Sequence, residues 1–78
     1  MRAGKFGGTY DAEADAAYFS LAPDVEEGDA VRQDFVEWEG GGEIILDFDA
    51  DNRLLGVEVI GARAVLRAST LRRAKRIG

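Results

Sequence analysis

The amino-acid sequence predicts one small α+β domain: an antiparallel β-sheet of four to five strands, arranged as two hairpins, followed by a short C-terminal helix. In several segments before Gly61, apolar residues recur at every second position, the period of half-buried strands. After Gly61 the apolar spacing becomes helical. A chain of 78 residues has room for one hydrophobic core. We therefore expect a single domain over residues 1–78, with the sheet over about 4–61 and a basic helical tail over about 62–78.

The first hairpin is predicted from Lys5–Tyr10 and Asp15–Leu21. In the second of these segments, apolar residues recur at every second position from Ala17 to Leu21, as expected of a half-buried strand. Asp11 opens the polar connection between the segments, because its side chain can hydrogen-bond the backbone two residues on. We expect the two segments to pair as antiparallel strands.

An exposed connection and a less regular strand come next. Pro23–Asp29 contains the only proline, a glycine and four acidic residues, a composition typical of surface loops. Ala30–Glu39 has apolar residues on both parities, which predicts a strand with a bulge or a switch of face. Gly40–Gly42 then permits a tight reversal, because glycine reaches positive φ without steric cost.

The clearest strands form the acidic hairpin, Ile44–Ile60. Its two arms, Glu43–Phe48 and Leu55–Ile60, both alternate with period two. Between them, Ala50–Arg53 contains Asp-Asn, a pair suited to the left-handed conformations that a tight hairpin turn requires. The sequence therefore predicts a second hairpin with an acidic face.

The C-terminal segment is predicted to be helical. Ala62, Val65 and Leu66 share one helical face. Ser69 or Thr70 is suited to cap a fresh turn. We expect one short helix, followed by a second one or by a fraying basic end.

The composition excludes most familiar enzyme chemistries. Cysteine and histidine are both absent, which removes thiolate metal sites, the commonest general base and histidine-based triads. A carboxylate pair remains conceivable for acid–base work, but a domain this small offers little cleft in which to desolvate it; its candidates are Asp11, Asp15, Asp47 and Asp49. We therefore expect no enzymatic activity and no cofactor.

Charge is strongly segregated along the chain. Residues 1–61 carry a net charge of 4 − 15 = −11, whereas residues 62–78 carry +6, which together give the net charge of −5. The basic residues of the tail are the candidate interaction residues: Arg63, Arg67, Arg72, Arg73, Lys75 and Arg76. They could track phosphates, but the acidic body repels nucleic acid and offers the tail a nearer partner, in the same chain or in a second copy.

The acidic hairpin also resembles a calcium loop. Asp47, Asp49 and Asp51 occupy relative positions 1, 3 and 5, and Glu58 occupies position 12. Asn52 stands at position 6, where the sharp turn prefers glycine. Strand-like alternation on both sides argues against the flanking helices of an EF-hand. We therefore favour a solvated or arginine-paired face, with a cation site as the alternative.

Two stretches resemble family 2283 of the bacterial domains of unknown function. Tyr10–Leu21 is similar to the family's Tyr-Asp-x-Glu-Ala-Asp-Ala-Leu-Tyr motif, with Ala17 in place of the usual leucine. Ile45–Ile60 is similar to its Asp-Tyr-Asp-x-x-Gly-Arg-x-x-Gly-Ile-Glu-Ile segment, with Asn52 in place of the turn glycine. The resemblance implies a small sheet-plus-helix fold, no established activity, and an antitoxin-like or partner-binding role as one possibility.

Together these features predict a non-enzymatic interaction or self-association module, a homodimer or the binder of a basic protein. Calcium binding by the acidic hairpin and nucleic-acid binding by the basic tail are the alternatives. The N-terminus has no long apolar run behind its two basic residues, so we expect no signal peptide, no membrane association and a cytoplasmic location.

Overall fold

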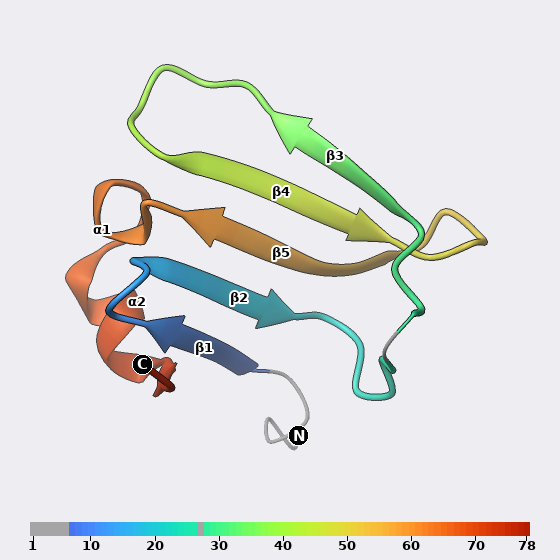
Figure 1. Ribbon diagram of the computed structural model, residues 1–78, viewed down its shortest axis with the longest axis horizontal. Helices are drawn as coiled ribbons and strands as arrows, with labels where there is room; N and C mark the ends of the chain where they lie inside the picture. The colour runs from blue at the N-terminus through green and yellow to red at the C-terminus, as the bar shows by residue number, and fades with distance from the viewer. Residues whose placement is uncertain (1–6, 27) are drawn as a thin grey trace.

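The computed structural model describes residues 7–26 and 28–78 (Figure 1). A single sheet of six strands in the order β3-β4-β5-β2-β1-β6 forms the body of this α+β domain. All neighbouring strands are antiparallel except β1 and β6, which are parallel. The elements are β1 (Gly7–Asp11), β2 (Ala16–Ser20), β3 (Arg32–Val36), β4 (Glu43–Phe48), β5 (Leu54–Ile60), α1 (Ala62–Val65), α2 (Ala68–Arg73) and β6 (Lys75–Arg76).

The antiparallel sheet, both hairpins and the C-terminal helical segment agree with the sequence prediction, but the strand count does not. The expected four to five strands become six because Lys75–Arg76 is extended and pairs with Thr9 and Tyr10 of β1. The helical tail is also divided, into α1 and α2. Arg67 rather than Ser69 or Thr70 precedes the second helix, and it caps it without a side-chain hydrogen bond.

The hairpins are joined at the centre of the sheet by β2 and β5. The register places Ala17 opposite Val59 and, on its other side, opposite Tyr10. These three side chains and Ala62 of α1 form the buried core, and each is 4% exposed or less. Ala17, the position where the family motif has leucine, is 2% exposed at the centre of this core.

The helices cover only part of one sheet face. Residues packed against the core come from β2, β5, the turn after β1 and the C-terminal segment. In Figure 1 both helices lie at one end of these strands, and β3 runs along the opposite edge of the sheet with no helix beside it. None of the five β3 residues is buried or half-buried. Neither helix within the described residues is long and apolar enough to cross a membrane.

Burial in β4 differs between the two faces of the sheet. Ile44 and Leu46 share the face of Val59 and Val57, on which the helices lie, and are half-buried. Ile45 and Asp47 point to the other face and are 6% and 7% exposed. The place of Asp47 in the acidic hairpin predicted a solvated or arginine-paired carboxylate, but Asp47 is buried and forms no ion pair with an arginine of residues 7–26 and 28–78. Its carboxylate instead accepts a hydrogen bond from the Gln33 amide at 2.9 Å.

Candidate functional site

Half of the basic residues predicted to form an interaction site line one open cleft. This cleft, of about 570 Å³, lies between β1 and the helices, with Leu66 and Leu71 among its apolar lining residues. Arg63, Arg72 and Arg76 contribute guanidinium groups to it, whereas Arg67, Arg73 and Lys75 do not line it. We call this feature the basic cleft.

Asp15 fixes one wall of the basic cleft. Its carboxylate accepts hydrogen bonds from the Tyr10 hydroxyl at 2.8 Å and from the Arg63 backbone N–H at 3.0 Å. Its backbone carbonyl accepts the N–H groups of Gly61 and Ala62, at the start of α1. The Arg63 guanidinium lies 3.6 Å from the same carboxylate. Sequence reasoning placed Asp15 only among possible acid–base groups. The residues next to Asp15 in the sequence do not indicate that the start of α1 packs against it.

The phenol groups of the sheet are held in their neutral form. Burial, followed by the hydrogen bond to Asp15, raises the pKa of Tyr10 above its ordinary value. Burial also raises the pKa of Tyr18, and the negative charges of Asp47 and Glu58 raise it further. Each shift favours the protonated phenol in the folded protein.

We therefore expect alkaline conditions to destabilise the fold. In the unfolded chain both phenols titrate near pH 10, so the stability that they contribute is complete below about pH 10 and is lost as pH rises through the higher folded values. Titration of tyrosinate absorbance should give midpoints above about 10 in buffer and near 10 in urea. Tyr18→Phe isolates Tyr10, and a midpoint at or below the urea value would contradict the assignment.

The acidic hairpin does not gather its carboxylates around one point. Asp49 turns into its own loop, where Oδ1 accepts the backbone N–H groups of Asp51 and Arg53, each at 2.9 Å. Asp47 is engaged with Gln33. Within residues 7–26 and 28–78, no group of three or more acidic side chains is placed to hold a metal ion. Asn52 has φ of 64°, the left-handed conformation expected for this turn.

The remaining carboxylate of the proposed acid–base set also serves a turn. Asp11 Oδ1 accepts the backbone N–H groups of Glu13 and Ala14, at 3.0 and 3.2 Å, which confirms its predicted role in the first hairpin connection. The four aspartates considered for catalysis thus have separate structural partners.

The second candidate site is the outer edge of β3. Asp49 donates its backbone N–H to Arg53 on the β5 side, so alternate residues of β4 counted back from Asp49 also face β5. The intervening, even-numbered residues of β4 therefore face β3, and the even-numbered residues of β3 with which they pair face back. The N–H and C=O groups of Gln33 and Phe35 are left pointing away from the sheet.

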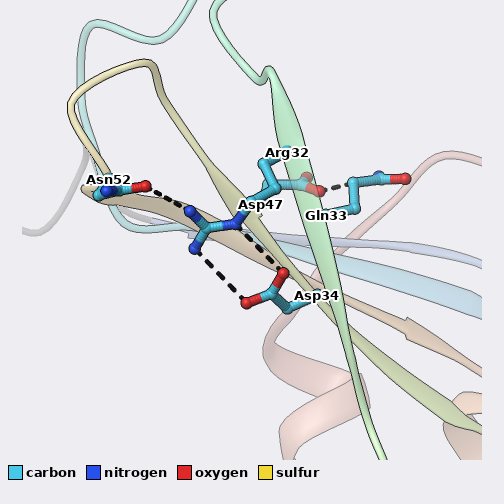
Figure 2. Close-up of polar contacts among 5 residues, drawn as sticks. All are labelled: Arg32, Gln33, Asp34, Asp47 and Asn52. Atoms are coloured by element: carbon cyan, nitrogen blue, oxygen red, sulfur yellow. Dashed lines mark hydrogen bonds and ion pairs between the residues drawn. The ribbon is translucent and has the colours of Figure 1, made fainter.

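The side chains along this edge are exposed. Phe35 is 63% exposed, and Val36 is 39% exposed. Arg32 lies flat over the Phe48 ring, with its guanidinium carbon 4.3 Å from the ring centroid. Figure 2 shows the Arg32 guanidinium bonded to both Asn52 and Asp34, the Asp34 contact being 3.2 Å. We call the outward side of Arg32–Val36 the β3 edge.

Sequence reasoning did not identify the β3 edge. It predicted the strand and noted that its apolar residues fall on both parities. This pattern is the available signal, because a strand with no consistently apolar face has no single face that packs against a covering layer. Which strand would form the rim of the sheet depends on long-range pairing, so this signal could not be interpreted alone.

A family model described as "Protein of unknown function (DUF2283)" matches residues 9–63. The match contains β2 to β5, including the β3 edge, and ends before α2 and β6. Comparison with curated proteins gives no match, and comparison with solved structures gives none either. The family match spans well over half of the 78 residues. The chain therefore belongs to the DUF2283 family.

Proposed function

We propose that this protein is a non-enzymatic protein-interaction module that binds an extended polypeptide segment along the β3 edge. The proposal rests on one observation: the outward N–H and C=O groups of Gln33 and Phe35 lie beside a phenylalanine side chain that is 63% exposed. An added strand satisfies such backbone groups, while exposed side chains provide selectivity.

The two edges of the sheet support this choice differently. β6 closes the edge beside β1 with only two residues, both basic, and short charged strands protect an edge from pairing. β3 presents five exposed residues and no covering helix. An antitoxin-like role is one form of this proposal.

The alternatives have less support. A calcium site would require Asp47 and Asp49 to give up hydrogen bonds that they already accept. Nucleic-acid binding in the basic cleft is opposed by the ion pair of Arg63 with Asp15. The Tyr10 ring at its base is only 4% exposed, so it offers no platform on which a base could stack.

The test is a proline at Gln33. Gln33→Pro removes the outward N–H together with the side-chain amide that donates to Asp47. Edge strands accept proline where the N–H faces solvent. We expect the immobilised Gln33→Pro chain to capture its partner from an extract of the source cells at least about tenfold less than the parent chain, a loss of about 1.4 kcal/mol.

Gln33→Ala is the matched control, because it also removes the side-chain amide but keeps the backbone N–H. It should capture the partner as the parent chain does, and circular dichroism should show all three chains folded. Equal capture by all three chains would exclude binding along the β3 edge.

A further inference from the structure

We infer that the occupant of the β3 edge is the same strand of a second copy of this chain, antiparallel to it, with Gln33 on the two-fold axis. The inference rests on the proposed function, since it names the partner of the same edge. Its basis is the self-complementary order of charges and backbone groups along Arg32–Val36.

The backbone permits this register. The N–H and C=O of Gln33 point away from β4, so two copies of Gln33 facing each other exchange a reciprocal pair of N–H···O=C hydrogen bonds. Arg32 and Asp34, on either side, then form the closer, non-hydrogen-bonded pairs of the ladder, with Cα atoms about 4.5 Å apart.

The charges favour this register. With Gln33 on the axis, each Arg32 stands opposite Asp34 of the second copy, and the symmetry makes this contact twice. Both side chains have room for a further partner, because Arg32 is 44% exposed and Asp34 is 51% exposed. Arg32 is already held in place by Phe48 and Asn52, so less side-chain entropy is lost on pairing.

The neighbouring registers lack this complementarity. A shift that puts Asp34 on the axis sets two carboxylates directly opposite each other, which is destabilising. A shift that puts Phe35 on the axis leaves Asp34 opposite Val36 and Arg32 opposite Trp38, so neither charge finds an opposite charge. Only the Gln33 register pairs every charge of β3.

The same register brings exposed apolar residues together. It sets Val31 of one copy beside Phe35 of the other. Val31 lies just before β3 and donates its backbone N–H inward to Phe48, so this pair adds a side-chain contact and not a reciprocal pair of ladder hydrogen bonds. Val31 and Phe35 are the most exposed large hydrophobic side chains within the described part of the chain, at 62% and 63%. Pairs of aromatic and β-branched side chains across strands are stabilising. Because β6 protects the other edge of the sheet, the symmetry closes at two copies and does not continue into a fibre.

The test uses two charge-reversal variants. Each variant should repel a second copy of itself, and the two variants should attract each other. Asp34→Arg leaves only positive charges on this face of β3, and Arg32→Asp leaves only negative ones. In sedimentation equilibrium we expect the parent chain to dimerise with a dissociation constant on the order of 10–100 μM, as a small interface implies. Each variant alone should associate at least about tenfold more weakly, and an equimolar mixture should regain parent-like dimers.

Mixing separates the interface from effects within one chain, since neither variant keeps its internal Arg32–Asp34 pair. A parent chain that stays monomeric, or a mixture that stays monomeric, would overturn the inference. Gln33→Pro should also abolish the dimer, whereas Gln33→Ala should preserve it. The parent chain could be monomeric and still capture a partner that the Gln33→Pro chain does not capture. In that case the occupant is not a second copy, and the proposed function stands. If Gln33→Pro changes neither dimer nor capture, both are wrong.

Discussion

Replacing Gly42 with alanine is expected to lower the free energy of unfolding by about 3 kcal/mol or more, as strain at a special backbone conformation combined with a steric clash implies. Gly42 has φ of +85°, and a Cβ there would lie 2.5 Å from the backbone oxygen of Ile60 and 2.9 Å from Val65 Cγ2. A backbone oxygen cannot turn aside as a flexible side chain can. The β3–β4 connection, the end of β5 and α1 must therefore shift together.

Such a loss is large for this domain, because a chain of this length has a total stability of about 4–12 kcal/mol. Urea unfolding followed by tryptophan fluorescence measures it. Gly41→Ala is the matched control: its Cβ would meet only Ala64 Cβ at 3.5 Å, an ordinary contact. We expect that variant to change stability by less than about 1 kcal/mol. Equal losses in the two variants would show that Gly42 is not constrained in this way.

Asp15→Ala is expected to destabilise the fold by about 2–3 kcal/mol, the range for removing a charged acceptor from partly buried donors. The Tyr10 hydroxyl and the Arg63 N–H both lose their acceptor. Asp15 also has φ of 53°, a left-handed conformation that alanine adopts less readily than aspartate or asparagine. The first hairpin would then be held to the start of α1 by the backbone carbonyl of residue 15 and no longer by its side chain.

Asp15→Asn tests this explanation, because it keeps an oxygen acceptor and tolerates the left-handed conformation. We expect it to retain more than half of the stability that Asp15→Ala loses, measured by urea unfolding. Tyr10→Phe completes a double-mutant cycle with Asp15→Ala. If the two single losses simply add, the Tyr10–Asp15 hydrogen bond contributes nothing to stability, and the role of the Asp15 carboxylate is reduced to its contacts with Arg63.

These variants separate the stability of the fold from its interaction surface. Asp15 lies where the first hairpin meets the start of α1, and Gly42 lies where the β3–β4 connection meets Ile60 and Val65. The β3 edge is the outer edge of the sheet beyond β4 (Figure 1). Asp34→Arg and Arg32→Asp change exposed positions and should leave the melting temperature close to that of the parent chain. Gln33→Pro and Gln33→Ala both remove the amide that donates to Asp47, so they are compared with each other. A loss of pairing in those variants then reports on the edge itself.

The sequence by itself determined the local elements of this protein. Alternation located β2, β4 and β5, because each has a periodic apolar pattern of its own. Asp11 and Asn52 marked their turns correctly, since an aspartate cap and a left-handed asparagine depend only on neighbouring residues. The change to helical spacing after Gly61 located α1. Membership of the DUF2283 family followed from motifs within these same segments.

Only the tertiary structure decided how these elements face one another. The pairing of β2 with β5 and the addition of β6 depend on contacts between residues far apart in sequence, which periodicity does not encode. The pairing of β4 with β5 sets Ile45 and Asp47 on the face away from the helices, and these two residues are buried while Ile44 and Leu46 are half-buried. The strand order places β3 at a rim with no helix beside it, so the candidate interaction site arises from the order of the strands and the short reach of the helices.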